Sequence, residues 1–271
     1  PIDSEKFSKF HDKENVISRP EFLQNLSNEN KIIGITGTHG KTSTTALLSH
    51  IFHFNNVNVS YIYGGVTNFN GIGGHYGDSD QPIILETDEA FNTFEKILIS
   101  DLLVLNIDSD HLDFFKNFNN YKDAFLKVMK NVKGNLVINN DDPVLQNVEG
   151  FDQSITYGKY KDSNFLILNP EKFLYDNTEY NLNSNILGDH FRSNMIGAII
   201  LAMKNGISIS ESLDAISSFP GVKRRTELIG VAKGISVYDD YGHHPTEMNA
   251  TIKSLKKVTN NKLYVVFQPH R

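Results

Sequence analysis

A short glycine-rich stretch, GITGTHGKTST at residues 34–44, has the residue types that hold a phosphate group. Gly37 and Gly40 let backbone N–H groups approach phosphate oxygens, and a helix that begins after the loop would add the positive end of its dipole. Lys41 can neutralise the outer phosphates, and the Thr42 hydroxyl can ligate Mg²⁺. The usual G-x-x-x-x-G-K-[ST] spacing needs a glycine at position 35, where Ile35 stands, so the loop is a shortened variant. The alternative is an ordinary glycine turn that caps a helix. The predicted phosphate contacts are Gly37, Thr38, His39, Gly40, Lys41, Thr42 and Ser43.

Two further motifs offer ligands for a metal ion. Glu86 ends the apolar run in IILETDEA, where a carboxylate that faces the phosphate loop can hold Mg²⁺ or polarise an attacking group. His111 stands between acidic residues in NIDSDHLDFF, and a neutral imidazole there could complete a metal site. A solvated acidic loop and a structural histidine are the alternatives. We therefore predict Thr42, Glu86 and His111 as metal ligands.

The second half of the chain adds polar clusters of its own. His190 and Asn194 in GDHFRSN are four residues apart at a helix start, where they could clasp a planar base or simply cap the helix. Arg225 in VKRRTE could bring a cation onto a transferring phosphate, or could belong to a solvated basic turn. YDDYGHHPTE at 238–247 is too rich in functional side chains to be explained by folding alone. Its candidates are Asp240, Tyr241 and His243, and the motif FQPHR adds His270 and Arg271.

The elements that position these residues alternate between apolar strands and amphipathic helices, which predicts an α/β fold with a mostly parallel sheet. The polar clusters follow the strands directly, and in open α/β sheets ligands bind beyond the carboxyl ends of the strands. Residues 151 to about 183 are aromatic-rich and favour antiparallel strands or loops. The other predicted strands are 31–36, 82–86, 101–108, 134–143, 234–240 and 262–271, and the predicted helices are 45–54, 119–132, 190–206 and 246–258.

Composition excludes several classes of protein. The chain has 271 residues, 39% of them hydrophobic and 21% charged, as expected for a soluble globular protein. The net charge of −6 argues against a nucleic-acid-binding surface. No apolar run approaches the roughly 18 residues of a membrane span. The absence of cysteine excludes disulfides and thiolate metal sites and fits a cytoplasmic protein.

Taken together, these motifs resemble the Mur ligases of bacterial cell-wall synthesis. The shortened GTHGKTST loop is similar to the ATP loop of that family, and ETDE, NIDSDHLD and NDDPVL agree with it. The resemblance runs from about residue 15 to the end. Within the family, DDYGHHPTE with FQPHR is most similar to members that add L-alanine to UDP-N-acetylmuramate. The alternatives are a murein-tripeptide recycling ligase, another Mur-type amino-acid ligase, or a fragment that only binds nucleotide.

The resemblance implies ATP and Mg²⁺ as cofactors. Lys41 and Thr42 would bind the β- and γ-phosphates and a first Mg²⁺, while Glu86 and His111 would ligate magnesium near the γ-phosphate and the substrate carboxylate. His190 and Asn194 would contact adenine. The family usually has asparagine after the first of these two residues, whereas this chain has Phe191.

For the other contacts, the resemblance implies Arg225 near the phosphates and Asp240 on the ribose. Tyr241 and His243 would lie near the incoming alanine, and His270 and Arg271 near the acidic substrates. The implied catalytic set is Lys41, Glu86, His111, Arg225 and His243.

The resemblance also implies a domain organisation. Residues 1–30 would be the tail of an N-terminal UDP-binding domain, 31–221 a central ATP-binding domain, and 222–271 the truncated start of a Rossmann-like C-terminal ligase domain. We therefore expect the chain by itself to form no amide product.

Overall fold

The computed structural model describes residues 16–67 and 71–268, and a ten-stranded sheet forms its centre. The strand order is β10-β9-β8-β7-β6-β5-β1-β4-β2-β3. The strands are β1 (Ile32–Thr36), β2 (Ser60–Ile62), β3 (Gly74–His75), β4 (Ile83–Glu86), β5 (Asp101–Val104), β6 (Leu136–Asn139), β7 (Ile155–Gly158), β8 (Phe165–Asn169), β9 (Lys172–Tyr175) and β10 (Thr178–Asn181). The predicted α/β class with a mostly parallel sheet is confirmed.

Strand β1 lies in the middle of the parallel part of the sheet. It pairs in parallel with β4 on one side and with β5 on the other, and all five of its residues are buried. A strand covered on both faces needs a continuous apolar sequence, which IIGIT supplies apart from its terminal threonine. This arrangement places the loops after β1, β4 and β5 at one edge of the sheet.

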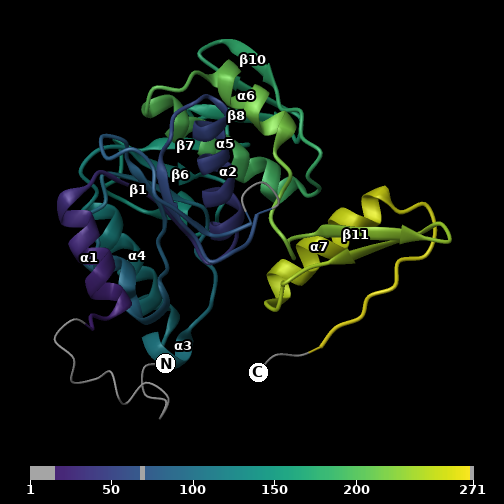
Figure 1. Cartoon of the computed structure of the whole chain (residues 1–271), viewed down its shortest axis with the longest axis horizontal. Coiled ribbons are helices and arrows are strands. Elements are labelled where there is room, and N and C mark those ends of the chain that lie inside the picture. Colours follow the sequence, from purple (N-terminus) through teal and green to yellow (C-terminus); the bar gives the residue numbers. More distant parts are fainter. Residues whose placement is uncertain (1–15, 68–70, 269–271) are drawn as a thin grey trace.

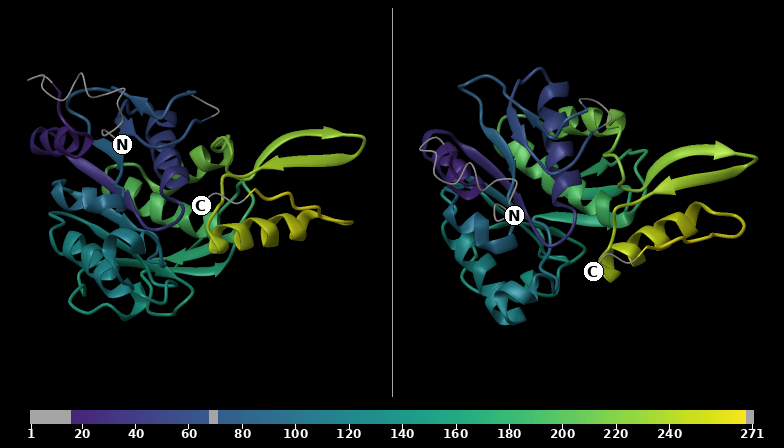
Figure 2. Two further views of the ribbon diagram at one scale, coloured as in Figure 1. Left: turned by 90° about the horizontal axis from the view of Figure 1, so that it is seen from below. Right: turned by 60° about the horizontal axis from the view of Figure 1, so that its bottom comes forward.

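Helices cover the two faces of the sheet as separate layers (Figures 1 and 2). One layer consists of α2 (Lys41–Phe54), α5 (Asp189–Lys204) and α6 (Ile209–Ser218), which pack on one another over the larger hydrophobic cluster. The other contains α1 (Arg19–Glu29), α4 (Phe118–Lys130) and the 3-10 helix η2 (Ala90–Lys96), over the second cluster. Two short helical segments, α3 (Leu112–Phe115) and η3 (Leu145–Asn147), complete this part of the chain. None of the helices in the described ranges has the length and apolarity to cross a bilayer.

The predicted elements around the sheet are confirmed, with strand ends that shift by up to four residues. The helix predicted over 190–206 begins at Asp189, and Gly206 follows its C-cap with φ of +96°, as a terminating glycine should. Within residues 151–183 only part of the prediction holds. Strands β9 and β10 are antiparallel, but β7 and β8 continue the parallel sheet.

The C-terminal unit, residues 222–268, projects from the side of the main body (Figures 1 and 2). Strands β11 (Glu227–Ala232) and β12 (Ile235–Asp239) form an antiparallel hairpin, followed by α7 (Pro245–Val258). Strand β12 and helix α7 were predicted, whereas β11 was not. The predicted strand over 262–271 is wrong for residues 262–268, which form no strand, and 269–271 lie outside the described residues. No neighbouring strand within the described chain pairs with this segment, and Tyr264 and Val266 are 80% and 99% exposed.

Candidate active site

The glycine-rich loop after β1 has two positions, Gly37 and Gly40, where the backbone conformation and the packing favour glycine. Gly37 has φ of +142°, and a Cβ there would lie 2.9 Å from Leu105 Cβ. Gly40 has φ of +85°, and its Cβ would lie 2.5 Å from Asn194 Nδ2. Both positions combine a left-handed backbone with close packing, so a side chain at either one would strain the loop. The two glycines therefore fix the path of the loop into α2.

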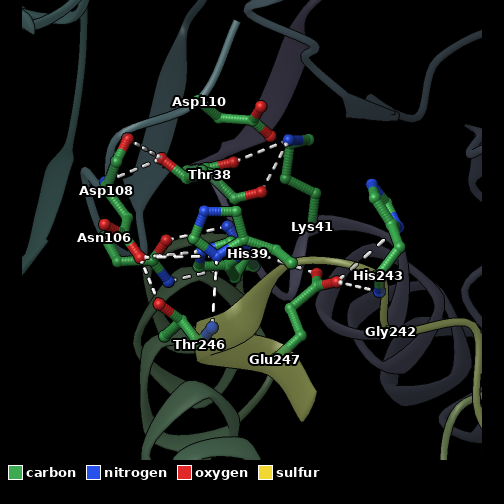
Figure 3. Close-up of polar contacts among 12 residues, drawn as sticks. Thr38, His39, Lys41, Asn106, Asp108, Asp110, Gly242, His243, Thr246 and Glu247 are labelled. Carbon is green, nitrogen blue, oxygen red and sulfur yellow. Dashed lines mark hydrogen bonds and ion pairs between the residues drawn. The ribbon is translucent and has the colours of Figure 1, made fainter. Parts of the chain in front are cut away.

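Asn106, two residues after β5, holds the loop in place (Figure 3). Its side-chain oxygen accepts a hydrogen bond from the His39 N–H at 2.8 Å, and its Nδ2 donates to the His39 carbonyl at 3.0 Å. The Thr38 N–H also donates to the Asn106 carbonyl at 3.1 Å. Sequence reasoning missed this residue. Its signal was a polar side chain in the apolar run predicted as a strand over 101–108, at the start of the NIDSDHLDFF motif that contains His111.

Lys41 makes a buried ion pair that the sequence did not predict. Its Nζ lies 2.8 and 3.0 Å from the two carboxylate oxygens of Glu89, which is 1% exposed, and it also donates to the carbonyls of Gly37 and Thr38. Burial raises the pKa of Glu89, although Lys41 opposes this effect. Tyr121 donates to the same carboxylate at 3.2 Å, and its hydroxyl lies 2.9 Å from Thr38 Oγ1. A cation is thus held at the mouth of the loop, where outer phosphates would lie.

The predicted magnesium ligands fall into two groups. The Thr42 hydroxyl donates to Glu86 Oε1 at 2.9 Å, and the Gly64 N–H donates to Glu86 Oε2 at 2.6 Å. A hydroxyl and a carboxylate at this distance are hard oxygen donors that suit Mg²⁺, so these residues fit the ion. His111 instead caps α3 with φ of +50°, and its Nε2 lies 3.8 Å from Asp110. Within the described part of the chain it makes no hydrogen bond to Thr42 or Glu86, and its metal role stays a prediction.

The start of α7 packs against the phosphate loop and against the segment that follows β5 (Figure 3). His39 Nδ1 lies 3.2 Å from Glu247 Oε1, and its Nε2 lies 3.1 Å from Asp108 Oδ2. Thr246 donates to the same Asp108 oxygen at 2.6 Å.

These contacts set the charge of the groups. Burial opposes the imidazolium, but the hydrogen bonds with Glu247 and Asp108 outweigh it and raise the pKa of His39. Burial likewise opposes the Glu247 carboxylate, but His39 and Arg225 lower its pKa to about 2.

A pocket of about 140 Å³ lies where the loop, α5 and the C-terminal unit meet. Seven of the residues predicted to bind nucleotide are among those that line it: His39, Gly40, Ser43, His190, Asn194, Arg225 and Asp240. A second pocket of about 340 Å³ continues from the loop along the start of α5, past Asn139 and Lys159. His190 and Asn194 border both pockets. Phe191, at the departure from the family pattern, is buried and packs beside Phe219.

The other predicted residues of the C-terminal unit form a small cluster around Tyr241. The Arg224 and Arg225 guanidinium carbons lie 5.1 and 5.3 Å from its ring centre, within cation–π range. His243 Nδ1 lies 3.9 Å from Glu247 Oε2, and 3.9 Å also separates Arg225 Nη1 from Glu247 Oε1.

Asp240 is held firmly beside this cluster. It accepts hydrogen bonds from the backbone and hydroxyl of Thr226, from the Gly242 N–H and from the Thr251 hydroxyl. His270 and Arg271 lie outside the described residues.

Two protein-family models match the chain. Residues 35–202 match the Mur ligase middle domain, and residues 224–271 match the Mur ligase glutamate ligase domain. The chain belongs to the Mur ligase family. The shortened phosphate loop, the Glu86 carboxylate at the end of β4 and the segment after β5 all lie within the middle-domain match. Arg225 and the two histidines that precede α7, His243 and His244, lie in the second one.

Curated Mur ligases and solved structures resemble the chain over most of its length. It is 35% identical over 270 residues to UDP-N-acetylmuramate--L-alanine ligase of Endomicrobium trichonymphae, covering 94% of this chain and 60% of the relative. The same enzyme of Lawsonia intracellularis is 38% identical over 272 residues, with 94% and 59% covered. The chain therefore spans about 60% of the length of these relatives.

The structural comparisons agree on the fold. The Thermotoga maritima UDP-N-acetylmuramate-alanine ligase superposes with a TM-score of 0.75 at 24% identity, covering 89% of this chain and 57% of that one. A murein peptide ligase from Psychrobacter arcticus superposes with a TM-score of 0.67 at 23% identity, with 91% and 59% covered. At these identities the likeness shows the Mur ligase fold alone.

Proposed function

We propose that this chain is the nucleotide-binding part of an ATP-dependent amide ligase of peptidoglycan precursor synthesis. One observation carries the proposal. Lys41 and the glycine loop lie beside a pocket that is completed by His190, Asn194 and Asp240 from two separate parts of the chain. A phosphate loop alone would fit many nucleotide enzymes. This pocket adjoins the larger one of about 340 Å³ along α5, and the convergence of these residues on the two pockets fits the binding of a nucleoside triphosphate between the two parts.

Each predicted residue then has a role. The loop N–H groups and Lys41 would bind the β- and γ-phosphates, and Thr42 with Glu86 would hold Mg²⁺, which neutralises the charge on the phosphates. His190 and Asn194 would contact adenine, and Asp240 the ribose.

The remaining residues would act in phosphoryl transfer and in binding the other substrates. Arg225 would approach the transferring phosphoryl group, and His111 would complete a metal site. Tyr241, His243, His270 and Arg271 would contact the acceptor and donor substrates.

The reaction proceeds in two steps. The substrate carboxylate attacks the γ-phosphorus of ATP, which gives an acyl phosphate and ADP. The amine then attacks the acyl carbon, the phosphate leaves, and an amide bond remains. Positive charge at Lys41 and Arg225, together with the bound position of the reactants, would provide most of the rate enhancement. Because ATP is supplied in the cytoplasm, we place the reaction there.

For the substrates, we propose UDP-N-acetylmuramate and L-alanine. The support is the 35–38% identity to enzymes named for that reaction. A murein peptide ligase is the second candidate, since such an enzyme shares the fold at a TM-score of 0.67.

We also propose the domain boundaries 1–30, 31–221 and 222–271, and that turnover requires the remaining length found in relatives. The chain alone should then release no phosphate above background when it is given ATP, Mg²⁺ and both substrates.

A panel of radiolabelled amino acids tests the assignment in a protein that carries this sequence at the full length of its relatives. UDP-N-acetylmuramate and ATP are supplied, and incorporation is compared among L-alanine, glycine, L-serine and a murein tripeptide. Preferential incorporation of L-alanine supports the proposal. Incorporation of the tripeptide alone identifies the recycling reaction instead, and nucleotide-independent incorporation refutes both.

A further inference from the structure

His39, Asp108 and His244 form a compact three-residue cluster where the phosphate loop meets the C-terminal unit. His39 comes from the loop after β1, Asp108 from the segment after β5, and His244 is the N-cap of α7. One ligand atom from each residue lies within 4.8 Å of the other two. The cluster does not include Thr42, Glu86 or His111, the ligands expected for the nucleotide's magnesium.

We propose that this cluster is a second cation site, which takes a transition-metal ion such as Zn²⁺ and fastens the C-terminal unit to the phosphate loop. Two imidazoles and one carboxylate are the ligands of several known zinc and iron sites. Mg²⁺, by contrast, prefers oxygen ligands and retains its waters. The chemistry of the cluster therefore selects against the ion that accompanies ATP.

The distances fit a tetrahedral ion. His39 Nε2 lies 3.1 Å and His244 Nδ1 3.8 Å from Asp108 Oδ2. Bonds of about 2.0–2.1 Å at tetrahedral angles place neighbouring ligand atoms about 3.3 Å apart. Small side-chain rotations are thus enough to seat the ion, with water in the fourth position.

The outer contacts of both histidines also suit a metal site. A metal-bound histidine usually donates its other ring N–H to a carboxylate or a backbone carbonyl. His39 Nδ1 faces Glu247 Oε1 at 3.2 Å (Figure 3), and His244 Nε2 faces the Ser109 carbonyl at 3.2 Å. These partners leave His39 Nε2 and His244 Nδ1 as the metal-binding nitrogens, and both of these nitrogens face Asp108 Oδ2.

The ion would replace the hydrogen bond between His39 Nε2 and Asp108 Oδ2, and two hydrogen bonds of Thr246 also reach the cluster. The Thr246 N–H donates to His244 Nδ1 at 3.3 Å, and the Thr246 hydroxyl donates to Asp108 Oδ2 at 2.6 Å. The first contact is long and is lost when the metal takes the nitrogen lone pair. The second can persist, because a carboxylate oxygen can accept a hydrogen bond while it binds a metal.

Zn²⁺ titration by calorimetry, with Co²⁺ absorption as a report on geometry, tests the site in this chain. The chain has no cysteine, so a tetrahedral Co²⁺ spectrum must come from nitrogen and oxygen ligands. We expect one tight Zn²⁺ that excess Mg²⁺ does not displace. His39→Ala or His244→Ala should weaken it at least about 100-fold, and Glu247→Gln about 10- to 100-fold.

His75→Ala is the matched control, since His75 lies on the edge strand β3 and bonds Asn58. This variant should keep the tight site. If His244→Ala lowers the melting temperature, His244→Gln replaces it. Wild-type affinity in both the His39 and His244 variants, or an octahedral Co²⁺ spectrum, overturns the proposal.

A distance measurement tests the fastening itself. Cysteines introduced at the exposed positions Lys161 and Lys233, one in each part of the chain, are spin-labelled without background thiols. Zn²⁺ should narrow the interspin distance distribution in the otherwise wild-type chain and leave it unchanged with His244→Ala. An unchanged distribution in both proteins would show that the ion does not join the two parts.

Discussion

Replacing Lys41 with methionine should destabilise the chain even without nucleotide, because the lysine is the counterion of a buried carboxylate. Lys41 and Glu89 side chains are 13% and 1% exposed, and their charged atoms lie 2.8 Å apart. Removing one partner of a buried ion pair costs about 3–5 kcal/mol. At about 2–4 °C per kcal/mol for a domain of this size, the melting temperature should fall by about 6–20 °C.

The pH dependence of this loss identifies its cause. Burial already raises the pKa of Glu89, and loss of Lys41 removes the group that opposes this effect. A carboxyl group whose pKa is higher in the folded than in the unfolded state favours folding at low pH, and this contribution is lost as the pH rises. The destabilisation should therefore be small near pH 5 and largest near pH 8. Thermal melts of Lys41→Met across this range provide the measurement.

The double variant Lys41→Met with Glu89→Gln provides the control. It removes the unpaired charge and keeps an acceptor for the Tyr121 hydroxyl, which donates to Glu89 at 3.2 Å. At pH 8 it should regain at least about half of the lost stability. A Lys41→Met protein that melts within about 2 °C of wild type at pH 8, or a double variant no more stable than the single one, would refute the buried ion pair.

Three further predictions concern the loop, the metal and the first residue of strand β5. Gly37→Ala should lower the free energy of unfolding by about 1–3 kcal/mol, because it forces φ of +142° on a residue that has a Cβ. An unchanged midpoint of urea unfolding would contradict this prediction. Mn²⁺ added with nucleotide should broaden the His111 imidazole resonances, and sharp resonances at saturation would exclude His111 as a ligand. Asp101→Asn should lower the free energy of unfolding by about 1.5–3 kcal/mol relative to wild type at pH 7. Although burial opposes the charge, Asn135, Asn205 and Lys31 lower the pKa of Asp101, so this difference should shrink below about pH 4. A pH-independent difference would point to packing instead.

The sequence predicted the gathering of polar residues after β1, β4 and β5, because buried parallel strands leave a clear apolar signal and their carboxyl ends share one edge. The contacts of Thr42 with Glu86 and of His39 with Asn106 confirm that these segments meet. Within the loop, the path of the backbone could be predicted from Gly37 and Gly40, since few other arrangements use two such glycines before a lysine.

Partners that are distant in sequence could not be predicted in the same way. The pairing of Lys41 with Glu89 depends on the turn after β4, and that of His39 with Glu247 depends on how α7 packs against the loop. The number of residues between the partners of each pair is not fixed by any local motif, so the sequence alone does not identify the pair. The strand expected over 262–271 is absent over 262–268 for a related reason, because an apolar run forms a strand only where another strand is available to pair.

Oxygen-isotope transfer tests the proposed chemistry most directly. A protein that carries this sequence at the full length of its relatives is given ATP, L-alanine and UDP-N-acetylmuramate labelled with ¹⁸O in both carboxylate oxygens. The acyl phosphate mechanism predicts that the released phosphate contains one ¹⁸O atom for every amide formed, and that Lys41→Ala releases none. Amide formation with unlabelled phosphate would contradict the transfer of the γ-phosphoryl group to the carboxylate.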